Sequence, residues 1–206
     1  LMENLDVLSS LRGAQELMMD LIEDPDMIKE RVDQVTKAYF PIFDAFYEQV
    51  KDAEGGNAYN CFQIWAPGRL SKLQCDASAM MSTEMFDEFV LDSLRYQTEH
   101  LDYSMYHLDG PGAVRHLDSI LTVPELSGVQ WLNGAGAPGL DQWPDIYRSI
   151  HDAGKLCQVF INGSSELWYI DFITELLGTT RGLCFICSGQ ENEREAFEKY
   201  LEKYGV

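Results

Sequence analysis

The segment from Tyr103 to Arg115, YSMYHLDGPGAVR, holds the densest group of side chains that could do chemistry. His107 and Asp109 are two residues apart on a predicted strand, so both side chains leave the same face at neighbouring levels. Such a pair can share one metal ion or one bound molecule. The glycines and proline at 110–112 then allow a sharp turn into a helix whose first amide groups attract an anion. The alternative for His107 is a structural histidine that a carboxylate orients.

Three kinds of chemistry fit these residues. A zinc ion held by His107, Asp109 and Cys187 would have an imidazole, a carboxylate and a thiolate, with a position left open for substrate. Alternatively, Asp76 and Asp109 could act as a carboxylate pair, one as acid and the other as base or nucleophile, as in glycoside hydrolysis. Third, Asp109 together with an arginine could bind and protonate a carbon acid. The candidate catalytic residues are therefore Asp76, His107 and Asp109.

A short repeat marks the ends of four predicted strands, where an apolar residue, a small polar residue and a glycine follow one another. It reads LDG at 108–110, LNG at 132–134, ING at 161–163 and CSG at 187–189. These residue types suit the tight turn that leaves a strand and caps the next helix. The carboxyl ends of parallel strands are also where α/β folds keep their functional sites.

Polar residues also occur within the predicted strands. Gln74 shares a face with Asp76 and Gln158 shares one with Asn162, whereas a strand face packed under helices should be apolar. A polar face of this kind favours a barrel lumen or pocket over an open doubly wound sheet. We expect the substrate-binding residues to come from these strands and the turns after them: Gln130, Trp131, Asn133, Gln158, Asn162 and Arg115.

The elements that must position these residues fall into two segments. Residues 1–56 read as an N-terminal helical segment, with one helix opening at Pro25, a kink at Pro41 and a stop near Gly55. Residues 57–206 alternate between strand and helix patterns, which implies parallel strands joined by crossover helices within one structural domain. The predicted strands are 58–65, 72–75, 103–108, 128–132, 156–161 and 182–187, and the predicted helices are 82–100, 112–121, 143–151, 165–177 and 191–204.

Composition limits the classes of function. Of 206 residues, 46% are hydrophobic, and 15 Lys and Arg stand against 34 Asp and Glu for a net charge of −19. Such a charge disfavours nucleic acid and anionic membranes as partners, and a small-molecule substrate is expected instead. No stretch reads as a membrane helix or a signal peptide, so we expect a cytoplasmic protein. The five cysteines, an odd number in apolar contexts, are expected to be reduced thiols.

Several segments together resemble the uroporphyrinogen decarboxylase superfamily. They are LRGAQELMMDLIEDPDMI at 11–28, the segment 73–89 with Asp76 and STEMFDEF, HLDG at 107–110, and GVQWLNGAG at 128–136. The resemblance implies a (β/α)₈ barrel. It also implies one of two activities, which are cofactor-free decarboxylation of uroporphyrinogen and zinc-dependent methyl transfer between a methylated corrinoid and a thiol.

In the methyltransferases of that superfamily, a His-x-Cys pair and a later cysteine hold zinc. The resemblance places His107, Asp109 and Cys187 at these positions, so a carboxylate replaces one thiolate. The chain also lacks the decarboxylases' Gly-His motif, since it reads CSGQ at 187–190. A divergent enzyme that performs zinc-assisted methyl transfer, with a corrinoid protein as partner, is therefore the first expectation. Metal-free decarboxylation and a non-catalytic module that binds a tetrapyrrole or corrinoid are the alternatives.

Chain length sharpens the predicted fold class. The predicted strands recur every 25–30 residues, and a complete eight-strand barrel takes about 250 residues. We therefore expect an incomplete α/β barrel of the TIM type, with five to six parallel strands and extra N-terminal helices, as a C-terminal portion of a longer barrel. Either a homodimer or a complementing N-terminal portion would then supply the missing strands, and we expect the fragment alone to lack activity.

Overall fold

The computed structural model of the protein describes residues 4–205, a mixed α/β structure that opens with three helices. These are α1 (Asn4–Arg12), α2 (Ala14–Glu23) and α3 (Pro25–Val50). Asp24 caps α3 by accepting a hydrogen bond from the backbone amide of Met27 (3.2 Å), and Pro25 occupies the first turn, where its missing amide costs nothing. Residues 4–50 are therefore helical, as the sequence predicts, and α3 continues through Pro41 as one element. Residues 1–3 of the predicted helical segment lie outside the described residues.

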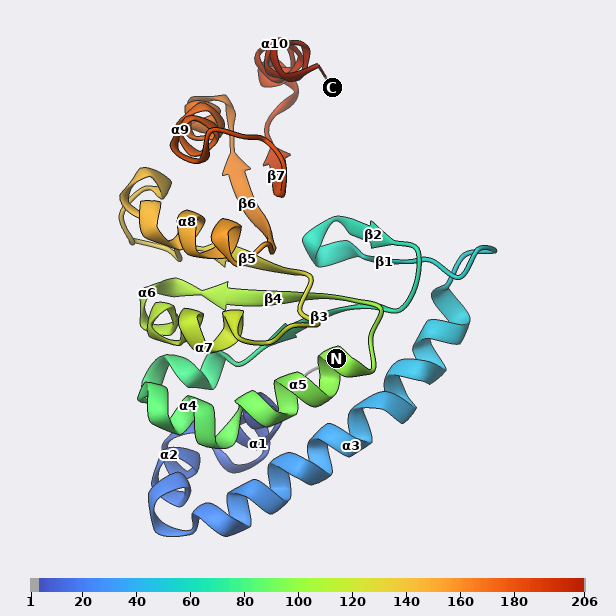
Figure 1. Cartoon of the computed structure of the whole chain (residues 1–206), viewed down its shortest axis with the longest axis vertical. Coiled ribbons are helices and arrows are strands. Elements are labelled where there is room, and N and C mark those ends of the chain that lie inside the picture. The colour runs from blue at the N-terminus through green and yellow to red at the C-terminus, as the bar shows by residue number, and fades with distance from the viewer. Residues whose placement is uncertain (1–3, 206) are drawn as a thin grey trace.

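A parallel sheet of five strands forms the centre of the molecule. In spatial order these strands are β3 (Leu70–Gln74), β4 (Tyr103–Asp109), β5 (Gly128–Leu132), β6 (Leu156–Asn162) and β7 (Leu183–Ser188). Figure 1 shows them following one another in chain order, from β3 in the lower half to β7 near the top. Sequential order is how a barrel is wound, whereas a doubly wound sheet reverses its order at a switch point. Within residues 4–205 the sheet is open, with β3 and β7 at its two edges.

Helices connect each strand to the next, as the alternating pattern predicts. They are α4 (Thr83–Phe89), α5 (Leu91–Glu99), α6 (Gly110–Ala113), α7 (Leu117–Leu121), α8 (Pro144–Asp152), α9 (Trp168–Leu177) and, after β7, α10 (Arg194–Tyr204). Short 3₁₀ turns η1–η6 lie at 60–62, 76–80, 114–116, 140–142, 164–166 and 191–193. The predicted helix 82–100 is divided at Val90, where φ widens to −118° while the residue stays in the right-handed helical region.

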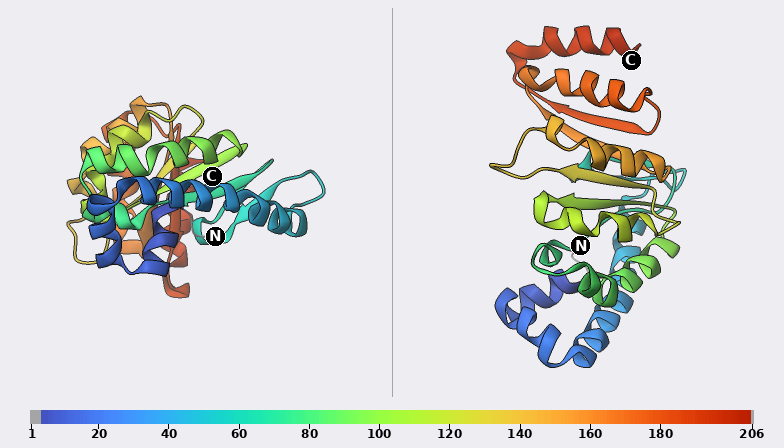
Figure 2. Two further views of the ribbon diagram at one scale, coloured as in Figure 1. Left: turned by 90° about the horizontal axis from the view of Figure 1, so that it is seen from below. Right: turned by 60° about the vertical axis from the view of Figure 1, so that its left-hand side comes forward.

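The predicted strand 58–65 is wrong. This segment instead forms an antiparallel hairpin of β1 (Asn57–Tyr59) and β2 (Ile64–Ala66), separate from the parallel sheet. Between them the chain turns through η1 (Asn60–Phe62) and through Gln63, which adopts the left-handed conformation (φ 51°). A left-handed residue reverses the chain, and a β-rich run in the sequence does not reveal it. In the left view of Figure 2 the hairpin and the end of α3 project from the rest of the molecule.

The two faces of the sheet differ in chemistry because side chains alternate along each strand. On one face, Leu108, Trp131 and Ile161 are fully buried in the core, together with Ile120, Tyr147 and Ile173 from the helices. The other face carries one residue of each strand in a single register row: Gln74, His107, Gln130, Gln158 and Cys184. The predicted polar face is therefore confirmed as a row that crosses all five strands.

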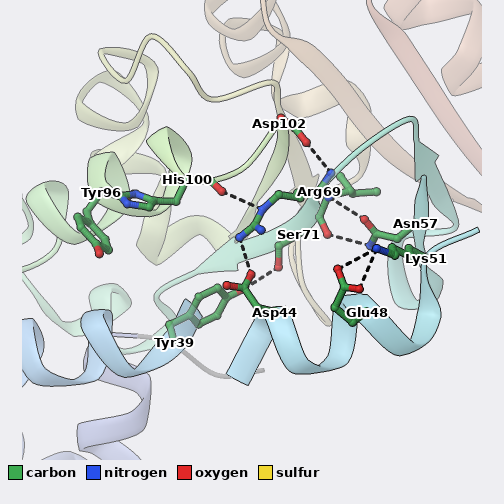
Figure 3. Close-up of polar contacts among 11 residues, drawn as sticks. Tyr39, Asp44, Glu48, Lys51, Asn57, Arg69, Ser71, Tyr96, His100 and Asp102 are labelled. Carbon is green, nitrogen blue, oxygen red and sulfur yellow. Dashed lines mark hydrogen bonds and ion pairs between the residues drawn. The ribbon is translucent and has the colours of Figure 1, made fainter. Parts of the chain in front are cut away.

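Side chains close the outer edge of β3 (Figure 3). The Asn57 amide group accepts a hydrogen bond from the Leu70 amide (2.8 Å) and donates one to the Leu70 carbonyl (3.0 Å), as a neighbouring strand would. Arg69 donates to Asp44 of α3 (2.6 Å), while on the side of β4 its backbone amide donates to Asp102 (2.8 Å). The N-terminal helices and the sheet also share one continuous buried core, which ties α3 to β3.

Among residues 4–205, no helix combines the length and the apolar character needed to cross a membrane. All five cysteines are free thiols in the structure. Three of the four strand-end glycines, Gly110, Gly134 and Gly163, have positive φ values of 73–80°. A backbone in this region favours glycine, so the strand-end repeat is turn chemistry at these three positions.

Candidate functional site

Asp76, His107 and Asp109 come together where β3 and β4 end. One ligand atom from each residue lies within 4.8 Å of the others, and within the described part of the chain this is the group that could hold a metal ion. His107 is half-buried, while the two aspartates are exposed on the rim. Gly110, with φ 73°, turns the chain immediately after Asp109 and leaves space beside it. The structure therefore brings together the three residues that the sequence proposes as catalytic.

Asp76 is held in place by α1, which the sequence does not indicate. The buried carboxylate of Asp6 accepts hydrogen bonds from the backbone amides of Asp76 and Ala77, both at 3.0 Å. Gln74 donates to Asp6 (3.1 Å) and to the Asp76 carboxylate (2.9 Å), and Lys72 donates to Gln74. Asp6 is separated from Asp76 by 70 residues, and no spacing or motif in the sequence links them.

The electrostatic environment of Asp76 favours neutralisation. Partial burial raises the pKa of the Asp76 carboxyl above its ordinary value, and the negative charge of Asp6 raises it further. Asp109 acts in the same direction, while His107 and Lys72 lower the pKa less than the other groups raise it. Asp76 thus has an increased affinity for a proton or for a cation.

A side chain of the neighbouring strand β5 fixes the imidazole of His107. Its Nδ1 lies 2.5 Å from Oε1 of Gln130, its register partner on β5. The ring also packs against the ring of Phe62 in the hairpin, with 5.5 Å between centroids. Since Nδ1 is engaged in this way, Nε2 is the ring nitrogen that remains for a ligand.

Cys187, the predicted third zinc ligand, does not join the cluster. On β7, Cys184 shares the register row with Gln158, and Cys187, three residues further on, points to the opposite, helix-facing side. There it lines a cavity of about 640 Å³ with Leu167, Phe185 and others under α10. Partial burial raises the pKa of its thiol, which disfavours the thiolate that zinc requires. The residue that lies beside His107 and Asp109 as a third potential ligand is Asp76.

Three of the predicted substrate-binding residues are buried. Trp131 faces the helices, is fully buried and packs edge-on against Trp143. Gln130 and Gln158 are also buried and bonded to each other (2.6 Å). The sequence places both glutamines on the correct face, but the hairpin with Phe62 covers that face where they lie, because the Phe62 carbonyl accepts a hydrogen bond from Gln158 (2.9 Å).

The other predicted substrate-binding residues lie at or after the carboxyl ends of β4, β5 and β6. Arg115 donates to the carbonyl oxygens of Gly112 (3.0 Å) and Met81 (3.4 Å), so its guanidinium braces the turn after β4. Asn133 donates to the Pro138 carbonyl (2.8 Å) and fixes the glycine-rich loop after β5. Asn162 accepts a hydrogen bond from Ser188 (3.2 Å) at the exposed ends of β6 and β7.

Comparison of the chain with protein-family models, with curated proteins and with solved structures finds no match. The comparisons therefore indicate no family. What the chain does must therefore be argued from its fold and its candidate site. The fold has a sequentially ordered parallel sheet, and the site is an Asp–His–Asp cluster at the carboxyl edge of two adjacent strands.

Proposed function

We propose that this chain carries the metal site of a barrel-type enzyme that acts on a small molecule, with Asp76, His107 and Asp109 as ligands of one divalent cation. The observation that supports it is the convergence of three ligand atoms within 4.8 Å, from residues that end two neighbouring parallel strands. The carboxyl edge of such strands is where this architecture keeps its catalytic groups.

The charges around the cluster also favour a cation. Three carboxyl groups, those of Asp6, Asp76 and Asp109, lie at the cluster, and the ammonium group of Lys72 reaches it through Gln74. A divalent cation would offset this excess of acidic groups. The imidazole and two carboxylates suit zinc, which accepts nitrogen and oxygen ligands, and also harder ions such as manganese. Because affinity follows the Irving–Williams order, zinc should bind more tightly than manganese.

The chain's residues leave room for substrate. Three protein ligands leave a tetrahedral ion one open position, and both carboxylates lie on the exposed rim. A zinc ion there would act as a Lewis acid on a thiol or oxygen of the substrate. The resemblance to the uroporphyrinogen decarboxylase superfamily suggests the reaction, methyl transfer from a corrinoid to a thiol, with a corrinoid protein as partner in the cytoplasm.

A second candidate function is metal-free decarboxylation. The raised pKa of Asp76 favours it, because a carboxyl group that holds its proton to a higher pH than an ordinary aspartate is better suited to act as a general acid. In this function Asp76 and Asp109 would contact the pyrrole nitrogens of a porphyrinogen and supply the proton that replaces the lost carboxyl group. Direct assay of uroporphyrinogen turnover by metal-free protein distinguishes this function from the first.

Zinc titration calorimetry tests the proposal. We expect one zinc per chain, and His107→Ala should lower the affinity by at least about 100-fold, since even outer-shell partners of metal ligands contribute 10–100-fold. His151→Ala removes a histidine outside the cluster and is the matched control. A folded wild-type protein that binds no zinc, or a His107→Ala variant that binds it as tightly, would contradict the metal site.

The affinity should also depend on pH. A proton and a cation compete for Asp76, whose pKa is raised, so zinc affinity should begin to fall at a higher pH than it would at an ordinary carboxylate. Asp76→Asn removes this competition together with one ligand. We expect it to bind zinc more weakly and with a flatter pH profile in the acid range.

A further inference from the structure

A row of amide side chains runs under the candidate metal site, from His107 on β4 to the hairpin. Gln130 Oε1 lies 2.5 Å from His107 Nδ1, and Gln130 Nε2 donates to Gln158 Oε1 (2.6 Å). Gln158 Nε2 then donates to the carbonyl oxygen of Phe62 (2.9 Å) and lies 3.7 Å from Cys184 Sγ. The two glutamines are 1% and 0% exposed, so water does not replace these bonds.

The Phe62 carbonyl sets the direction of the whole row. A carbonyl oxygen only accepts hydrogen bonds, so the NH₂ group of Gln158 must face it. The Gln158 oxygen consequently faces Gln130 and requires a donor, which turns the Gln130 NH₂ group toward it. The Gln130 oxygen is then left facing His107 Nδ1, and an oxygen there requires a proton on that nitrogen.

We propose that Gln130 and Gln158 are positioning residues that fix neutral His107 in its Nδ1–H tautomer. The Nε2 lone pair then points away from Gln130, available to the cation that Asp76 and Asp109 would share. The metal-binding role of this arrangement rests on the proposed function, whereas the tautomer itself does not. Metal-binding histidines are commonly oriented in this way, through a hydrogen bond from the second ring nitrogen.

The β1–β2 hairpin takes part in the same hydrogen-bonded row. Phe62 supplies the carbonyl that directs the row, and its ring packs on His107 at a centroid distance of 5.5 Å. Gln158 and Phe62 are 96 residues apart, so the hairpin orients the site by reaching across the sheet from β4 to β6. This gives β1 and β2 a role although they lie outside the parallel sheet.

Nitrogen NMR of the wild-type protein without metal tests the tautomer directly. Long-range ¹⁵N–¹H correlation at mildly alkaline pH, where histidine is neutral, distinguishes a protonated from a free ring nitrogen. With four histidines in the chain, a His107→Ala spectrum assigns the signal. We expect His107 to carry its proton on Nδ1 alone. A proton on Nε2, or a mixture of tautomers, would overturn the proposal.

Variants of the row provide the second test. Gln158→Met removes the group that directs Gln130, so His107 should become a mixture of tautomers and zinc affinity should fall by about 10-fold to 100-fold. Gln158→Glu offers only oxygens to Gln130 and should retain the Nδ1–H form. Gln97→Met is the matched control, because Gln97 is equally buried (1% exposed) in α5. An unchanged tautomer in Gln158→Met would contradict the proposal that the row of amide side chains fixes the tautomer of His107.

The experiments separate the two proposals. If the wild type shows the Nδ1–H form and binds no zinc, the proposed control of the His107 tautomer is supported and the proposed metal site is contradicted. If it binds zinc while its metal-free form shows the Nε2–H form, the metal site is supported and the control of the tautomer is contradicted. Should Gln158→Met not fold, the wild-type spectrum still decides the tautomer.

Discussion

At β5, in the middle of the parallel sheet, Trp131 is fully buried and packs against Trp143, whereas at β7, on the edge, every residue of the strand keeps contact with solvent. Likewise α8 buries Tyr147 and Ile150 completely, but no side chain of α10 is fully buried. A cavity of about 640 Å³ lies between β7, α9 and α10. Apolar packing therefore stabilises the middle of the sheet far more than its C-terminal edge.

Polar contacts hold the C-terminal edge instead. On α9, the carboxylate of Asp171 accepts hydrogen bonds from Lys203 (2.6 Å), Tyr204 (2.5 Å) and Tyr200 (3.1 Å) of α10. Glu193, just before α10, accepts from the amide and hydroxyl of Ser164 at 2.6 and 2.7 Å. The comparison teaches that different substitutions should destabilise the two regions. Loss of side-chain volume should destabilise the middle of the sheet, and loss of charge should destabilise its C-terminal edge.

The largest expected effect is on the packed middle. Trp131→Ala should lower the free energy of unfolding by about 3–5 kcal/mol, because it leaves a cavity in a closed core. Trp131→Phe should cost much less, since the indole Nε1 has no hydrogen-bond partner among the described residues. Urea unfolding followed by circular dichroism measures both. If Trp131→Ala cost no more than the edge variants below, the packing contrast would be wrong.

Acid should loosen the edge before the middle. Hydrogen bonds from the Gln190 amide and from Ser164 lower the pKa of Glu193 to about 2, against an ordinary value of 4.5. A lowered pKa means that the stabilisation is present above pH 4.5 and is lost as the pH falls from 4.5 toward 2. The protection factors of α10 amides, which correct for the intrinsic pH dependence of hydrogen exchange, should therefore fall in that window. In Glu193→Gln this fall should be smaller, with Asp171 accounting for the rest, and an equal fall would assign it to another group.

A smaller effect is expected for the contact between α9 and α10. Burial raises the pKa of Asp171, but the hydrogen bonds from Lys203 and the two tyrosines lower it by more, so the net shift of the pKa is downward. Asp171→Asn should weaken the docking of α10 by about 1 kcal/mol, because the site is partly solvated. Hydrogen exchange in residues 194–204 measures this, with Glu175→Gln on the same helix as the control. Equal exchange in the two variants would argue against the contact.

The smallest effect should come from the exposed ion pair within α10. Arg194 donates to Glu198 at 2.8 Å, four residues along the helix. Such pairs contribute about 0.3–0.5 kcal/mol, so Arg194→Ala should leave the unfolding transition nearly unchanged. A loss as large as that of Asp171→Asn would show that the surface of α10, and not its contact with α9, holds the edge.

Much of the fold could be predicted from local pattern. The run of β4 and the glycine turn after Asp109 are confirmed, because alternation and turn residues act within a few positions of the chain. The strand 58–65 could not be predicted correctly, since the left-handed Gln63 divides it into a hairpin. Local patterns indicate whether a segment forms a helix or a strand, but they do not indicate which partner a short strand pairs with.

The site could be predicted in part. Two-residue spacing places His107 beside Asp109, and the shared edge of parallel strands adds Asp76. The residue types at the strand ends, and then the resemblance, predict Cys187 in the same site, yet its position on β7 turns it to the helix-facing side. Trp131 likewise belongs to the core, because the parity of its position on β5 turns it toward the helices. A single-residue difference in parity exchanges the two faces of a strand.

The sequence by itself determined the alternation of strands and helices, the polar face of the sheet and the residue types at the strand ends, because each depends on neighbours a few positions away. The tertiary structure decided which of these residues act together. Asp6 reaches Asp76 across 70 residues, and Phe62 directs Gln158 across 96. Such contacts depend on how the elements pack against one another, so no spacing within the chain encodes them.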